Sequence, residues 1–133
     1  MGELVDLLFG LKGRIDRGTW WAVRAFGIMI LFSIGLCIYV PLESPELRGS
    51  LVPSILGAIS TVVCTVSVWI DLATTVKRWH DRDHSGWMYF IRLIPIVGPI
   101  WTLVECGFLP GVPGSNRYGP SPASLETPRR APA

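Results

Sequence analysis

The stretch Lys77-Arg78-Trp79-His80-Asp81-Arg82-Asp83-His84-Ser85-Gly86-Trp87 is the densest polar run in the interior of an otherwise apolar chain. Residues 51–70 before it carry no charge, and a second apolar run, residues 87–109, follows it. A polar turn between two apolar segments of this length predicts a membrane protein, because each segment is long enough to enter a bilayer. We therefore expect any specific chemistry to lie on this turn.

The composition supports a membrane protein with one domain. Of the 133 residues, 50% are hydrophobic and 17% are charged, whereas soluble domains carry about 25% charged residues. The net charge of +2 is too small to indicate nucleic-acid binding. The three cysteines, Cys37, Cys64 and Cys106, lie in apolar runs and form no CxxC pair, so we expect no disulfide framework, metal or cofactor.

Three apolar segments predict an all-α membrane bundle with spans at about residues 20–40, 51–70 and 87–109. The third contains Pro95, Gly98 and Pro99, and a proline removes a backbone donor and clashes with the preceding helical turn. We expect a kinked third span, with a re-entrant pair of half-helices as the alternative. Residues 3–11 are too short to span and are predicted to form an amphipathic helix at the interface or a cap on the bundle.

Basic residues predict the orientation, because cytoplasmic loops are enriched in Lys and Arg. They flank the first span and fill the turn between the second and third: Lys12, Arg14, Arg17, Lys77, Arg78 and Arg82. The loop at residues 41–50 has only Arg48, so the N-terminus is predicted to be cytoplasmic. Residues 110–122 are rich in turns, and residues 123–133 are predicted to be a disordered tail. With three spans this tail lies outside, and with a re-entrant third run it lies inside.

Three phrases carry a resemblance to a known family. They are Gly13-Arg14-Ile15-Asp16-Arg17 with Trp21, Arg78-Trp79-His80-Asp81 with Ser85-Gly86-Trp87, and the segment Pro110-Gly111-Val112-Pro113-Gly114-Ser115-Asn116-Arg117-Tyr118-Gly119-Pro120. In this order they resemble the DUF805 (YhaH-like) family of small bacterial inner-membrane proteins, with departures at Trp79, Val112 and Ser121. The resemblance implies a single membrane domain over residues 1–122 in a bacterial inner membrane. It implies no activity, since the family's function is unassigned.

One interpretation of the turn is purely structural. Asp81 then pairs with Arg14 or Arg17, or caps the helix that begins near Ser85, and His80 donates to a backbone carbonyl. A second interpretation is binding, in which a basic cytoplasmic face attracts anionic lipid or an acidic protein partner, each cation contributing about 1 kcal/mol near the surface. The candidate binding residues are Arg14, Arg17, Lys77, Arg78, His80, Asp81, Arg82 and Trp87.

Two further hypotheses remain open. One is a small transporter or lipid-handling protein that self-associates to a homo-oligomer, with a pathway along Arg92, Pro95, Gly98 and Pro99, because charges and helix breaks inside spans are functional candidates. The other is a metal-dependent enzyme at His80 and Asp81. We favour a non-enzymatic module, with no catalytic residue and membrane lipid as its partner.

Overall fold

The computed structural model describes residues 2–44, 46–47 and 50–122. The predicted disordered tail at residues 123–133 lies outside the described residues. Helices account for the regular structure of the described part of the chain, apart from one β-bridge between Asn116 and Gly119. In chain order they are α1 (Gly2–Phe9), α2 (Arg17–Glu43), α3 (Val52–Asp81), the 3₁₀ helix η1 (Gly86–Leu93), α4 (Val97–Thr102) and the π-helix η2 (Leu103–Phe108). The predicted all-helical class is confirmed.

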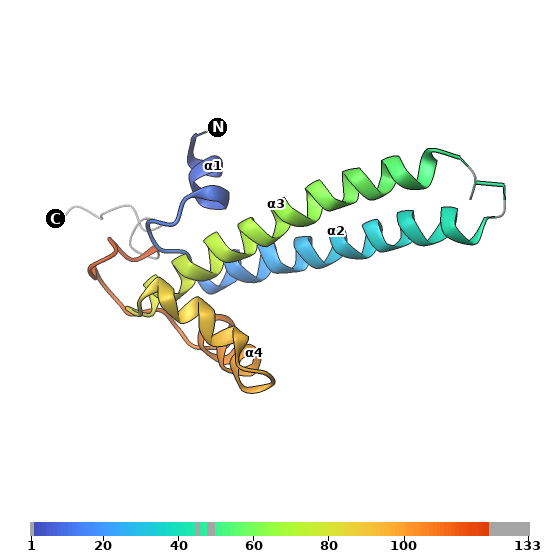
Figure 1. Ribbon diagram of the computed structural model, residues 1–133. Helices are drawn as coiled ribbons and strands as arrows, with labels where there is room; N and C mark the ends of the chain where they lie inside the picture. The colour runs from blue at the N-terminus through green and yellow to red at the C-terminus, as the bar shows by residue number, and fades with distance from the viewer. Residues whose placement is uncertain (1, 45, 48–49, 123–133) are drawn as a thin grey trace.

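Two of these helices, α2 and α3, are long and apolar enough to cross a membrane. They run side by side as an antiparallel hairpin (Figure 1). Their most apolar windows are 0% and 6% buried, which distinguishes them from the core helices of a soluble protein. The predicted span at residues 20–40 lies within α2. The predicted span at residues 51–70 begins at the N-cap of α3, and α3 continues for eleven residues beyond its end.

The start of α2 is fixed by Asp16, its N-cap. The Asp16 carboxylate accepts hydrogen bonds from the Gly18 amide at 2.7 Å and the Thr19 amide at 3.2 Å, which satisfies donors that the first helical turn leaves free. Burial alone would raise the pKa of Asp16, but the bonds from Thr19 and Gly18 outweigh it and hold this pKa below its ordinary value. The N-cap therefore sets where the chain turns into the first long helix.

The third apolar run does not continue as one helix. It runs away from the end of α3 as η1, reverses at residues 94–97 and returns as α4 and η2, so both of its ends lie beside the end of α3 (Figure 1). At the reversal Ile96 has φ of +66°, and the Gly98 amide donates to the Ile94 carbonyl at 3.0 Å. A Cβ on Gly98 would lie 1.9 Å from the Ile91 carbonyl oxygen, so the two arms meet where only glycine fits.

The predicted third full span, kinked at Pro95–Pro99, is therefore not confirmed. The chain takes the alternative form of two half-helices, and within the described residues two helices have spanning length. The physical reason is local. Pro95 and Pro99 supply no backbone donors, and Gly98 between them permits the close approach that a reversal needs.

The buried core lies at one end of the long hairpin, which we call the base. Residues 73–81 of α3 are all buried there, because α1, η1 and η2 pack around them. The core cluster consists of Ile15, Trp20, Trp79 and Cys106. Helix α1 takes the role of a cap: Lys77 Nζ donates to the carbonyls of Asp6 and Leu7 near its C-terminal end.

Candidate functional site

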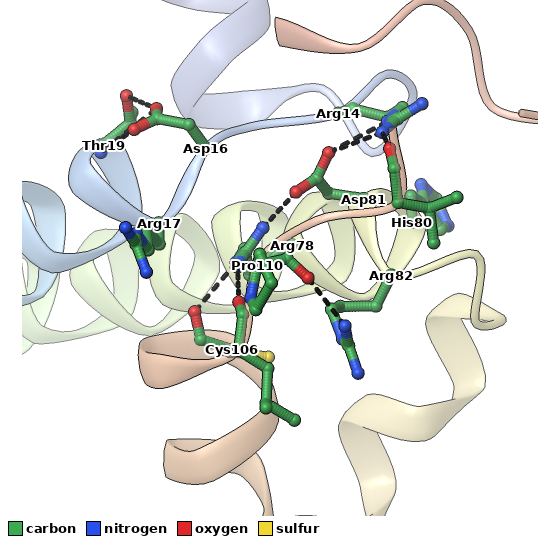
Figure 2. Close-up of polar contacts among 12 residues, drawn as sticks. Arg14, Asp16, Arg17, Thr19, Arg78, His80, Asp81, Arg82, Cys106 and Pro110 are labelled. Atoms are coloured by element: carbon green, nitrogen blue, oxygen red, sulfur yellow. Dashed lines mark hydrogen bonds and ion pairs between the residues drawn. The ribbon is translucent and has the colours of Figure 1, made fainter. Parts of the chain in front are cut away.

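A buried carboxylate between two arginines forms the centre of the base. Asp81, at the end of α3, accepts from Arg14 Nε at 3.0 Å and Nη2 at 2.9 Å through Oδ1, and from Arg78 through Oδ2. Both arginine side chains are 1% exposed and that of Asp81 is 3% exposed. Figure 2 shows Asp81 reaching toward both guanidinium groups. Two buried cations and one carboxylate require further acceptors, since unpaired buried charge is costly.

Backbone carbonyls of the returning chain supply those acceptors. Arg14 donates to the carbonyls of Val112 at 2.6 Å, Gly114 at 2.7 Å and Gly119 at 3.2 Å. Arg78 donates to the Cys106 carbonyl at 2.8 Å and to the Leu109 carbonyl, at the C-terminal end of η2. This end of a helix presents free carbonyls and favours positive charge.

Arg82 adds a third connection between α3 and the returning chain. Its guanidinium pairs with Glu105 at 3.0 Å and donates to the Pro110 carbonyl at 2.6 Å. We call the whole arrangement the polar clasp: Arg14, Arg78, His80, Asp81 and Arg82 together with residues 105–119. The polar clasp joins segments that lie up to 105 positions apart in the sequence.

His80 contacts two segments that lie far apart in the sequence. Its ring stacks on Tyr118, with centroids 3.8 Å apart and planes 6° from parallel, and its Nδ1 lies 3.3 Å from the Gly13 carbonyl. The Nδ1–H tautomer donates to that carbonyl, as the structural interpretation expects. The His80 carbonyl accepts from Asn116 Nδ2 at 2.8 Å, so His80 connects the segment before α2 to the chain that follows η2.

Gly111 is the closest approach of the returning chain to Asp81. The Val112 amide donates to the Asp81 carbonyl at 2.9 Å. A Cβ on Gly111 would lie 2.0 Å from Asp81 Oδ2, well inside van der Waals contact. Glycine at position 111 is thus a condition for the clasp to close.

The predicted binding residues fall into two groups. Five are buried and satisfied by protein groups: Arg14, Lys77, Arg78, His80 and Asp81. Their polar atoms face the chain itself: Lys77 donates to carbonyls of α1, and residues 105–119 fold back onto the other four. The others are reachable from outside: Arg17 is exposed, Arg82 is partly exposed, and Trp87 is 78% exposed.

The structure contains a second charged cluster, which the sequence analysis did not predict. Asp71 of α3 accepts from Arg24 of α2 at 2.7 Å and from Arg92 of η1. The Arg24 guanidinium lies over the Trp20 ring, 4.2 Å from its centroid. The sequence signal was Asp71 itself, the first charge after an uncharged run of spanning length. We call these three residues the Asp71 triad.

The residues of the pathway hypothesis lie in η1, in the reversal and in α4. Arg92 of η1 points to Asp71, the exposed Pro95 lies in the reversal, and the buried Gly98 and the exposed Pro99 lie in the first turn of α4.

Asp81, the candidate metal ligand, already has partners for both of its oxygens, since each accepts from an arginine. Ser85 is the N-cap of η1, and its Oγ accepts from the Trp87 amide. Among the described residues no group of three His, Cys, Asp or Glu side chains is placed to hold a metal ion.

The three phrases that resemble a family meet in the polar clasp, and comparisons with known proteins agree. The model of the family described as "Protein of unknown function (DUF805)" matches residues 8–120. The chain is 32% identical over 114 residues to the inner membrane protein YhaH of Escherichia coli K12, covering 85% of this chain and 87% of YhaH. It is 28% identical to the uncharacterized protein YiiR over 84% of this chain and 85% of YiiR, and 29% identical to the inner membrane protein YhaI over 85% and 86%, both from the same strain. No solved structure matches. The chain therefore belongs to the DUF805 family of membrane proteins, whose function is unknown.

Proposed function

We propose that this chain is a two-span, non-enzymatic membrane module of a bacterial inner membrane, with the base on the cytoplasmic side and in contact with anionic lipid. The base carries nine Lys and Arg side chains against seven Asp and Glu, whereas residues 41–50 carry one Arg against two Glu. The positive end of a membrane protein is normally cytoplasmic.

The contacts of Arg14 support a topology in which both ends of the domain lie on the same side of the membrane. Its guanidinium bonds directly to carbonyls of residues 112, 114 and 119, so the segment before α2 and the segment after η2 share one side of the membrane. This arrangement places Arg117 with the other basic residues. The half-helices η1, α4 and η2 then enter from the cytoplasmic side and return to it.

Exposed cationic side chains and exposed aromatic rings lie together around the base, and this combination supports contact with lipid. Arg17 is exposed beside Trp21, and Trp87 and Phe108 are 78% and 61% exposed. Tryptophan rings favour the headgroup region, and cations there attract anionic lipid. The buried arginines serve the fold, so this outer ring replaces them as the lipid-facing set.

The other hypotheses receive less support from the geometry. The metal-dependent hypothesis needs Asp81 free to bind a metal ion, yet both Asp81 oxygens are held by arginines. The transport hypothesis needs a pathway through Pro95–Pro99, and these residues form the tip of a helical reversal. We therefore assign neither catalysis nor transport to the chain.

The test is lipid selectivity in reconstituted vesicles. Quenching of the chain's tryptophans by brominated phosphatidylglycerol is compared with quenching by brominated phosphatidylcholine. We expect a preference for phosphatidylglycerol that falls by up to about fivefold in Arg17→Gln, the factor expected for one surface cation. Arg117→Gln is the matched control, because Arg117 is exposed at the base but paired with Asp83 at 3.4 Å. Equal quenching of the wild-type chain by the two lipids would overturn the proposal.

A further inference from the structure

We propose that the Asp71 triad is a binding site for the phosphate group of an anionic lipid headgroup. This inference rests on the proposed function and deepens it, since it assigns one specific site within the broader lipid-facing ring. The site is distinct from the polar clasp and lies where α2, α3 and η1 meet.

The Asp71 triad holds two positive charges and one negative charge. Asp71 is the only carboxylate that pairs with either Arg24 or Arg92 among the described residues, so two guanidinium groups share one counter-charge. A guanidinium has five N–H donors, and Arg24 uses Nη2 for Asp71 and for Thr75 Oγ1 at 3.3 Å. Arg24 Nε is buried and has no hydrogen-bond partner. In the polar clasp the corresponding charge excess is satisfied by backbone carbonyls, whereas in the described part of the chain Arg24 and Arg92 donate to the side chains of Asp71 and Thr75.

The triad lies at the base end of two long uncharged stretches. Residues 25–42 and 52–70 carry no charge, and Arg24 and Asp71 are the charged residues that bound these stretches on the base side. Glu43 lies nineteen positions after Arg24, and Asp71 lies nineteen positions after Val52; each distance is about 28 Å along a helix. The hydrocarbon core of a bilayer is about 30 Å thick. The triad therefore lies at the level of the lipid phosphates in one leaflet.

The triad is partly open to the outside. The side chains of Arg24, Asp71 and Arg92 are 23%, 31% and 27% exposed, so a headgroup phosphate can reach the exposed parts of both guanidinium groups, whereas Arg24 Nε is buried. Trp20 and Tyr89 lie against the two guanidinium groups and limit their freedom. Leu93 and Ile94, which follow Arg92, are 77% and 51% exposed and offer apolar surface to acyl chains. Planar guanidinium donors suit phosphate oxygens, which they bind in a bidentate manner.

The experiment is calorimetric titration of the full chain in a neutral detergent with dioctanoyl phosphatidylglycerol. Dioctanoyl phosphatidylcholine and inorganic phosphate are titrated separately. Arg92→Gln and Arg24→Gln each remove one cation and should weaken phosphatidylglycerol binding by about fivefold. Asp71→Asn keeps both arginines and removes their counter-charge, so it should strengthen binding. A general folding defect would weaken binding in all three variants, so stronger binding by Asp71→Asn would exclude such a defect. Arg117→Gln is the matched control and should bind like the wild type.

The outcomes separate this inference from the proposed function. Unchanged phosphatidylglycerol binding in Arg24→Gln, Arg92→Gln and Asp71→Asn, with weakened binding in Arg17→Gln, overturns the site and leaves the proposed function standing. No preference of the wild-type chain for phosphatidylglycerol over phosphatidylcholine overturns both. If inorganic phosphate binds as tightly as phosphatidylglycerol and is lost in the same variants, the site takes free phosphate, and the lipid assignment is overturned.

Discussion

Asp81 receives hydrogen bonds from arginines that come from two different parts of the chain. Arg78 lies one helical turn before it, and Arg14 precedes α2. Breaking a buried pair by removing one partner is costly because it leaves an uncompensated charge in a dry environment. Asp81 therefore links the N-terminal segment to α3, and the carbonyls that share its arginines link both to residues 106–119.

Asp81→Asn tests this role at the scale of one residue. The substitution keeps the shape of the side chain but leaves Arg14 and Arg78 buried without a counter-charge, so we expect a loss of about 3–5 kcal/mol in the free energy of unfolding. Thermal unfolding in detergent, followed by intrinsic fluorescence, measures the change. Asp83→Asn is the control, because the exposed Asp83–Arg117 pair should contribute about 1 kcal/mol or less. Equal midpoints for the two variants would show that Asp81 does not hold the base together.

The sequence predicted part of this residue-level arrangement. A pair between Asp81 and Arg14 was one of its options, and the predicted bond from His80 to a backbone carbonyl matches the position of Nδ1 near the Gly13 carbonyl. The role of Gly111 could not be predicted from the sequence, because its closeness to Asp81 depends on the path that the chain takes after η2. The burial of the basic residues was missed for the same reason, because it follows from long-range contacts with residues 105–119.

At the scale of elements, the reversal within residues 87–109 determines what the base becomes. Two prolines and a glycine are compatible with either a kink or a reversal, because both outcomes leave the same backbone donors missing. The choice depends on tertiary contacts: Trp21 Nε1 donates to the Gly107 carbonyl at 3.0 Å, and η1 lies along α3. Local sequence patterns do not contain that information.

Gly98→Ala tests the reversal directly. The new Cβ would lie 1.9 Å from the Ile91 carbonyl oxygen, so the arms η1 and α4 must separate. We expect a loss of about 1–3 kcal/mol in the free energy of unfolding, the usual range for overpacking a buried position. Chemical denaturation in mixed micelles is a suitable measurement. Gly35→Ala serves as the matched control, because nothing lies within 4 Å of a Cβ at this position of α2. A continuous third helix would tolerate alanine at both positions alike.

At the scale of the whole molecule, two regions follow different physical rules. Along residues 25–39 and 52–70 most apolar side chains are exposed or half-buried and can be covered by lipid, and hydropathy alone was enough to predict these two helices. At the base, polar and apolar groups are buried together, and hydropathy alone predicted a third span that the structure does not confirm. Residues 87–109 have the composition of a span and the length of one, but they belong to the base.

In the proposed topology Arg14 and residues 112–119 lie on one side of the membrane, opposite the loop between α2 and α3. Labelling of introduced cysteines in inside-out and right-side-out bacterial membrane vesicles tests this topology, with Lys12→Cys, Ser115→Cys and Glu46→Cys at exposed positions. The wild-type chain controls for its three native cysteines, of which Cys106 is buried. We predict that an impermeant maleimide labels positions 12 and 115 from the cytoplasmic side and position 46 from the opposite side. Labelling of positions 115 and 46 from the same side would contradict the account, because residues 87–109 would then cross the membrane as a third span.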